Sequence, residues 1–214
     1  MMIALPGLDG TLQPYQLGPP PAWQPSQAPP RSRVAYAAAH VVADPLGDPA
    51  APAATLDWDA TLRLRRHLWA HGLRVADGMD TAQRYMGLDW AAARELAVRS
   101  AAAALDFGDP AELVAVGAGT DHVPGARDLD SIVGAYTDQL EAIRAAGASV
   151  VLMASRELVR VARGPDDYLE VYARVLAQAD RPVIVHWLGE MFDPQLAGYW
   201  VRPTSGEPPR HSSS

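Results

Sequence analysis

Residues 112–153 read ELVAVGAGTDHVPGARDLDSIVGAYTDQLEAIRAAGASVVLM and contain a complete strand–helix–strand pattern. A short apolar run at 112–117 precedes a stretch with helical periodicity at 129–146, and Gly147 marks the end of that helix. A second apolar run follows at 149–153. Both runs are apolar at consecutive positions, which is typical of strands covered on both faces. The segment therefore predicts a parallel sheet flanked by helices.

The same alternation recurs on both sides of this segment. The predicted strands are 33–43, 73–76, 112–117, 149–153 and 182–187, and the predicted helices are 57–71, 89–105, 129–146 and 165–179. Alternating strands and helices indicate an α/β fold. No strand is followed by G-x-G-x-x-G or a P-loop, which disfavours an open, doubly wound sheet. The strand spacing is near the roughly 30 residues of a βα unit, so we predict a partial (β/α)₈ TIM barrel of about five parallel βα units.

Three regions are expected along the chain. Residues 1–32 combine a β-hairpin, with strands near 3–5 and 12–17, and a proline-rich connector. Because proline does not pair in central strands, we expect this region to lie on the surface or to plug one end of the larger body. Residues 33–200 form the partial barrel. Residues 201–214 have no periodicity and are predicted to be a disordered tail.

The composition excludes several classes of protein. The chain has 214 residues, of which 49% are hydrophobic and 20% charged, as in an ordinary globular domain. Its net charge is -7 and no basic stripe is present, so nucleic-acid binding is not expected. No apolar run approaches the roughly 18 residues of a membrane-spanning helix, so no membrane association is expected. The absence of cysteine excludes disulfides and fits a cytoplasmic, reducing compartment.

All 18 basic residues are arginine, and the chain contains no lysine. A lysine side chain is the usual amine nucleophile for carbonyl substrates. Any mechanism that needs such a nucleophile is therefore excluded within this chain.

Polar residues follow each predicted strand, and in a barrel these positions meet at one mouth, where the chemistry takes place. The candidates are His40, Asp80, Thr81, Asp121, His122, His186 and Glu190. We predict Asp121 and His122 to be catalytic, because a glycine turn does not by itself require a histidine. The other five are predicted to bind substrate. The competing interpretations are hydrogen-bonded core histidines at His40 and His186, and a turn cap at Asp80 and Thr81.

A metal site is the alternative interpretation of these residues. His40, Asp121, His122 and His186 suit a divalent ion by ligand type, as in metal-dependent sugar isomerases and aldolases. However, their spacing gives neither H-x-H nor H-E-x-x-H. We therefore predict no metal and no cofactor.

Four segments occur in the order typical of one family. They are DGMDT at 77–81, VAVGAGT at 114–120, AAGAS at 145–149 and RPVIVH at 181–186. Together they resemble the glycine loop after strand two, the third-strand glycine segment, the Ala-x-x-Gly-Ala motif and the fifth strand of the dihydrodipicolinate synthase superfamily. More narrowly, the chain resembles an uncharacterised branch of these aldolase-type TIM barrels.

The resemblance implies an aldolase or lyase that acts on a small oxo-acid or a sugar-derived carbonyl compound. In that family a lysine on strand six forms a Schiff base with the substrate. This chain departs from the pattern, because Met79 and Asp80 replace the paired threonines and residues 153–157 lack the tyrosine that follows strand four. A sixth strand and its lysine are also missing.

We therefore expect the N-terminal portion of a longer barrel, without lyase turnover on its own. The remaining possibility is a non-catalytic half-barrel that pairs with a partner. Such a chain would have two unpaired sheet edges, through which we expect a homo-oligomer to form.

Overall fold

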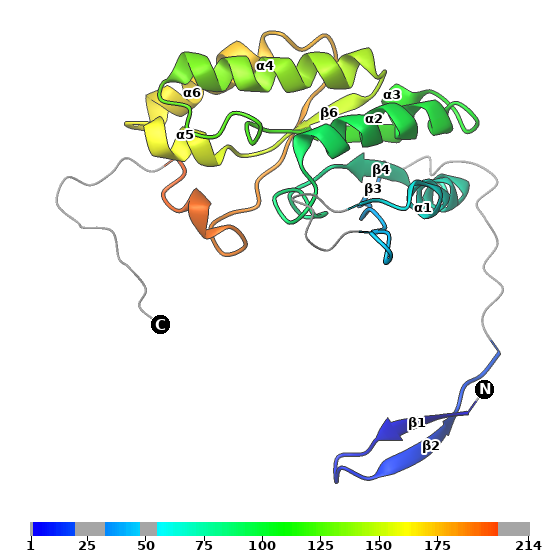
Figure 1. Cartoon of the computed structure of the whole chain (residues 1–214). Coiled ribbons are helices and arrows are strands. Elements are labelled where there is room, and N and C mark those ends of the chain that lie inside the picture. Colours follow the sequence, from blue (N-terminus) through cyan, green and yellow to red (C-terminus); the bar gives the residue numbers. More distant parts are fainter. Residues whose placement is uncertain (1, 20–32, 48–54, 201–214) are drawn as a thin grey trace.

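Five parallel strands form the central sheet of the chain. The computed structural model describes residues 2–19, 33–47 and 55–200 (Figure 1). The strands are β3 (Tyr36–Ala38), β4 (Arg74–Asp77), β5 (Val114–Ala118), β6 (Ser149–Leu152) and β7 (Ile184–Val185). Each strand pairs in parallel with the next one along the chain, which gives the order β3-β4-β5-β6-β7. This topology is that of a curled half-barrel and confirms the predicted fold class.

Helices connect the strands and cover the outer face of the sheet (Figure 1). They are α1 (Trp58–Ala70), α2 (Trp90–Ala104), α3 (Pro110–Leu113), α4 (Leu129–Ala145), α5 (Arg156–Val161) and α6 (Pro165–Leu176), with a 3₁₀ turn, η1 (Pro194–Leu196), near the end. Asp57, Asp89 and Asp128 cap α1, α2 and α4 by accepting a backbone N–H of the first turn. None of the helices in the described ranges is long and apolar enough to cross a membrane.

Side chains alternate between the two faces of each strand and so build two packing layers. The outer layer lies between sheet and helices and includes Val75, Val114, Val116, Val150 and Leu152. The inner layer lies on the concave face and comprises Ala76, Met79, Ala82, Ala115, Val151 and Met153. The inner strand positions carry small residues, and two methionines fill the space between them. Among the described residues, these side chains pack together on the concave face.

The element boundaries differ from the predictions at the edges of the sheet. The strand predicted at 33–43 is only three residues long, and the one predicted at 182–187 is only two. Both are edge strands with a single neighbour in the sheet. Only a few residues of each apolar run therefore form strand hydrogen bonds. Leu113 belongs to α3 instead of β5, because Asp109 caps a short helix there. Helix α5 was not predicted, since six residues are too few to show a period.

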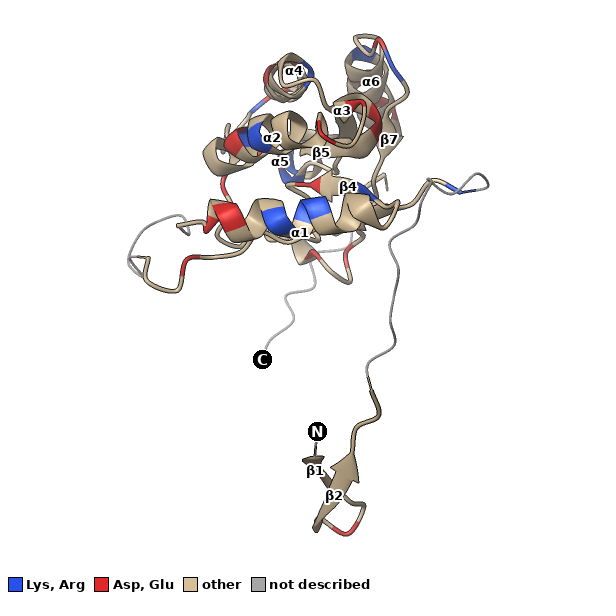
Figure 2. Ribbon diagram, turned by 90° about the vertical axis from the view of Figure 1, so that its right-hand side faces the viewer, with Lys and Arg blue, Asp and Glu red and all other residues tan. Residues whose placement is uncertain are grey.

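The N-terminal hairpin confirms the prediction. Strands β1 (Met2–Pro6) and β2 (Leu12–Gln16) pair in antiparallel register, from Met2 opposite Gln16 to Pro6 opposite Leu12. Their side chains are mostly exposed, and the only charged side chain of the hairpin is Asp9 in the turn (Figure 2). The connector at 20–32 and the predicted disordered tail at 201–214 lie outside the described residues. A role of the hairpin as a plug stays a prediction.

Replacing Gly117 by alanine should destabilise the half-barrel. A β-carbon at this position would lie 2.6 Å from the Gly78 carbonyl oxygen and 2.9 Å from the Met153 sulfur, so β5 could no longer approach the loop after β4. We expect Gly117→Ala to lower the free energy of unfolding by about 1–3 kcal/mol, as overpacked cores do. Denaturant titration provides the measurement.

Gly134→Ala is the matched control. Gly134 lies on the exposed face of α4, and no atom lies within 4 Å of the position that a β-carbon would take there. This change should therefore raise the free energy of unfolding by up to about 1 kcal/mol, because alanine favours the helix more than glycine does. Equal stabilities of the two variants would contradict the close approach at Gly117.

Candidate functional site

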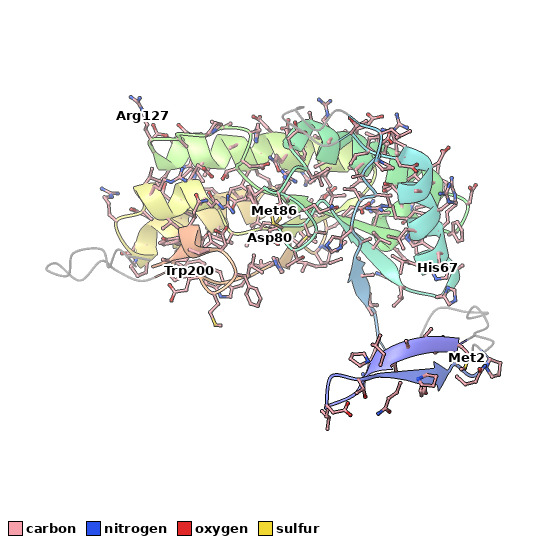
Figure 3. All side chains as sticks on the ribbon, turned by 60° about the horizontal axis from the view of Figure 1, so that its bottom comes forward. Met2, His67, Asp80, Met86, Arg127 and Trp200 are labelled. Carbon is pink, nitrogen blue, oxygen red and sulfur yellow. The ribbon has the colours of Figure 1, made fainter. Side chains whose placement is uncertain are left out.

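An ion pair spans the carboxyl end of the sheet. Asp80, in the loop after β4, lies with its Oδ1 3.1 Å from the Nε2 of His186, which directly follows β7. Strands β5 and β6 lie between β4 and β7 in the sheet. The contact therefore crosses the concave face, which is possible only because the sheet curls. Figure 3 labels Asp80 beside Met86 in the same loop.

The surroundings of His186 suit it to proton transfer. The Asp80 carboxylate raises the pKa of His186 above its ordinary value of 6.5, and partial burial opposes this effect only in part. The Asp80 side chain is 6% exposed, whereas that of His186 is 27% exposed. The imidazole is thus held by a buried carboxylate while solvent or a ligand can still reach it.

A second network is centred on Arg84, which is fully buried in the loop after β4. Its Nε and Nη2 donate to the two carboxylate oxygens of Asp121 at 2.8 and 2.7 Å. Its Nη1 donates to the carbonyl oxygens of Gly78 and Gly117, and Nη2 also donates to Gln139. All five guanidinium donors are therefore satisfied. This one side chain joins the loops after β4 and β5 to helix α4.

Gln139 extends this network to His122. Its Oε1 accepts from Arg84 and from the backbone N–H of Gly119, so its Nε2 must be the donor to Asp121 and to His122 Nδ1. A neutral His122 consequently carries its proton on Nε2. That nitrogen lies 3.5 Å from a carboxylate oxygen of Asp138 on the outer side of α4.

The carboxylate of Asp121 is held in its charged form. Burial acts to raise its pKa, but the hydrogen bonds and positive charge of Arg84 outweigh burial and keep the pKa below the ordinary value. Both oxygens are already engaged by Arg84, and Oδ1 also by Gln139. The geometry therefore favours a positioning role for Asp121 over direct proton transfer.

The buried hydroxyl groups of Thr120 and Ser155 link the segment after β5 to the segment after β6. Thr120 donates to Glu157 Oε2 at 2.7 Å, which leaves Ser155 as the donor to Thr120, also at 2.7 Å. Ser155 Oγ in turn caps α5 by accepting from the backbone N–H of Leu158. The chain of hydrogen bonds is complete, so these groups fix the start of α5.

Comparisons with known proteins agree with this architecture. A family model described as "Protein of unknown function (DUF993)" matches residues 3–207. The chain belongs to the DUF993 family. No curated protein matches it.

Solved structures show which fold the DUF993 chain adopts. The dihydrodipicolinate synthase from Oceanobacillus iheyensis aligns with a TM-score of 0.51 and 15% identity, over 77% of this chain and 48% of that protein. The enzyme from Bacillus clausii aligns with a TM-score of 0.50 and 14% identity, over 77% and 49%. The chain thus spans about half the length of these proteins. The predicted resemblance to an uncharacterised branch of that fold family is confirmed.

The structure brings only some of the predicted site residues of the DUF993 chain together. Asp80 meets His186, and Asp121 meets His122 through Gln139. The remaining three candidates, His40, Thr81 and Glu190, have exposed side chains. None of the described histidine, aspartate and glutamate side chains form a group of three or more that could hold a metal ion.

Two residues that organise this end of the sheet, Arg84 and Gln139, were not among the predicted site residues. Gln139 had a detectable signal, because it lies on the same face of α4 as the buried residues Tyr136, Leu140 and Ile143. A polar residue on an apolar helical face needs a partner. Arg84 had no such signal, since its loop carries no periodicity.

Removing the carboxylate of Asp80 should change the titration of His186. In Asp80→Asn we expect the pKa of His186 to fall toward or below 6.5, because the attraction that opposes burial is lost. The raised pKa stabilises the fold fully below the unfolded-state value and loses this effect as the pH rises through the folded-state value. The stability difference between wild type and Asp80→Asn should therefore be largest in acid.

The imidazole C–H resonances give the pKa of His186, and His67 on the exposed face of α1 serves as the internal control. An unchanged His186 titration in Asp80→Asn would contradict the ion pair.

Proposed function

We propose that this DUF993 chain forms the substrate-binding half of an aldolase- or lyase-type barrel that acts on a small oxo-acid or a sugar-derived carbonyl compound. The observation that supports it is the Asp80–His186 pair at the carboxyl end of the strands. In barrels of this kind the carboxyl end carries the chemistry. A histidine oriented by a buried carboxylate is a common general acid–base group.

In this proposal His186 moves the proton. Aldolase chemistry requires a proton to be removed from, or returned to, the carbon next to a carbonyl group. His186 is accessible on one side and held by Asp80 on the other, so it can shuttle this proton near neutral pH. Asp121 and His122, predicted as catalytic, instead hold the loop after β5 in place, while exposed His40, Thr81 and Glu190 contact the outer part of the substrate.

The 214 residues alone are proposed to be inactive as a Schiff-base lyase. They contain no lysine, and they correspond to about half of a barrel. The amine nucleophile would have to come from a segment outside this sequence or from another chain. Support for a cytoplasmic location comes from the cysteine-free composition.

Borohydride treatment in the presence of pyruvate tests this inactivity. We expect the intact mass of the chain to stay unchanged, because no lysine is present to form a reducible imine. A lysine-dependent aldolase treated in parallel is the positive control. A stoichiometric adduct that maps to an internal peptide would contradict the proposal.

A second candidate function is that of a half-barrel that pairs with another copy of itself. Strands β3 and β7 each have one neighbour in the sheet, so each presents an unpaired edge. Exposed apolar side chains gather at and after β7, namely Ile184, Val185, Trp187, Met191 and Phe192. A surface of this kind marks an interaction site more often than a free face.

Sedimentation velocity tests the pairing. We expect a dimer or larger species that dissociates in the Met191→Ser, Phe192→Ser double variant, because these two side chains are 91% and 76% exposed and contribute little to the fold itself. Leu169→Ser, on the exposed side of α6, is the matched control and should leave the oligomer intact. A stable wild-type monomer would contradict this function.

A further inference from the structure

The N-terminal hairpin forms a sheet of its own. This sheet contains only β1 and β2. Among residues 2–19 every side chain is exposed except at Ile3 and Gly7, which are partly exposed. A two-stranded hairpin is at best marginally stable in water, and further strands or a packing surface are normally needed. The hairpin therefore calls for a partner.

The hydrogen bonds of the hairpin determine which backbone groups point away from it. The N–H of Gly7 donates to the carbonyl oxygen of Thr11 at 2.8 Å, so these two residues form a hydrogen-bonded pair. Bonded and non-bonded pairs alternate along an antiparallel ladder. Counted along the register from Gly7, the residues with outward-facing backbone groups are Met2, Ala4 and Pro6 in β1, and Leu12, Pro14 and Gln16 in β2.

The two prolines make the two edges of the hairpin unequal. Pro14 is the central outward-facing residue of β2 and has no N–H, so a strand placed beside β2 would lack a hydrogen bond at its centre. Pro6 is the last residue of β1, so Met2 and Ala4 keep their outward-facing donors and acceptors. The outer edge of β1 is therefore the one that can take up another strand.

The backbone groups of this edge are complementary to those of a second copy. When two β1 strands pair in antiparallel direction about Ala4, the two Ala4 residues exchange both of their hydrogen bonds. Met2 of each copy then donates to the carbonyl oxygen of Pro6 in the other copy. Ile3 lies opposite Leu5 in a non-bonded pair, where side chains approach most closely. The small side chain of Ala4 lies at the two-fold axis.

The charge of the hairpin also favours a second copy as the partner. Asp9 in the turn is the only charged side chain among residues 2–19, so no like charges oppose each other when two β1 strands pair. Edge strands that must stay unpaired usually carry a charged residue or a central proline that prevents such pairing. The edge of β2 has a central proline, whereas the edge of β1 has neither.

We propose that the N-terminal hairpin is a dimerisation arm, whose β1 edge pairs with the β1 edge of a second copy of the chain. The product is a four-stranded antiparallel sheet with the order β2-β1-β1-β2. Ile3, Leu5 and Tyr15 of both copies lie on one face of this sheet. The contact is separate from association through β7 and is independent of the proposed enzymatic function.

Amide hydrogen exchange, followed by NMR, tests this pairing. The chain carries Met191→Ser and Phe192→Ser, so that the apolar surface after β7 does not contribute to association. Because the contact is small and association is weak, we expect the Ala4 amide to exchange at least about threefold more slowly at ~1 mM than at ~0.05 mM protein. The outward-facing Gln16 amide of β2 is the internal control and should exchange equally fast at both concentrations.

Two proline variants separate the edges. Ala4→Pro removes the outward-facing donor of β1 and should weaken dimerisation in sedimentation equilibrium by about tenfold or more, the effect of two lost hydrogen bonds. Gln16→Pro removes the same kind of donor from β2 and is the matched control, with a change of no more than about twofold. Cross-strand nuclear Overhauser contacts between Ile3 and Tyr15 verify that each variant keeps its hairpin.

Three results would overturn the proposal. The first is an Ala4 amide that exchanges as fast as that of Gln16 at ~1 mM protein. The second is slow exchange of Ala4 that does not depend on concentration, because the edge is then covered by its own chain. The third is an equal loss of dimer in Ala4→Pro and Gln16→Pro while both hairpins stay intact. None of these results bears on the aldolase proposal.

Discussion

The Arg84 guanidinium group organises the polar end of the half-barrel. It is fully buried, and its partners come from the loops after β4 and β5 and from helix α4. Removing one partner of such a buried pair typically costs about 3–5 kcal/mol, because the remaining charge is left without compensation. Asp121 and Gln139 bond directly to this group, and His122 is joined to it through Gln139. One side chain therefore ties together two loops and a helix at this end of the sheet.

The inner face of the sheet depends on small residues, because the Arg84 network needs a close approach of two backbone segments there. Gly117 admits the Gly78 carbonyl oxygen against β5, and that carbonyl is one of the acceptors for Arg84. The close packing and the Arg84 hydrogen bonds therefore depend on the same position, where β5 contacts the loop after β4. A side chain at this position would disturb both the methionine-filled layer and the arginine network.

The sequence predicted the architecture better than the site. Strongly periodic helices such as α1, α2 and α4 were located within about one residue, because capping aspartates and apolar faces are local features. Asp80 and His186 were both candidates, but their contact depends on the curl of the sheet, which no local pattern records. Arg84 was missed because its importance comes from partners on three distant segments.

The order of the strands has a consequence for how the chain folds. Every strand pairs with its neighbour in sequence, so the sheet can grow by adding one βα unit at a time as the chain leaves the ribosome. The Asp80–His186 contact is different, because it joins the second strand of the sheet to the last. Loop closure over such a separation is slow compared with local pairing. The half-barrel should thus acquire its fold first and its ion pair last, which makes this contact a natural reporter of the final step of folding.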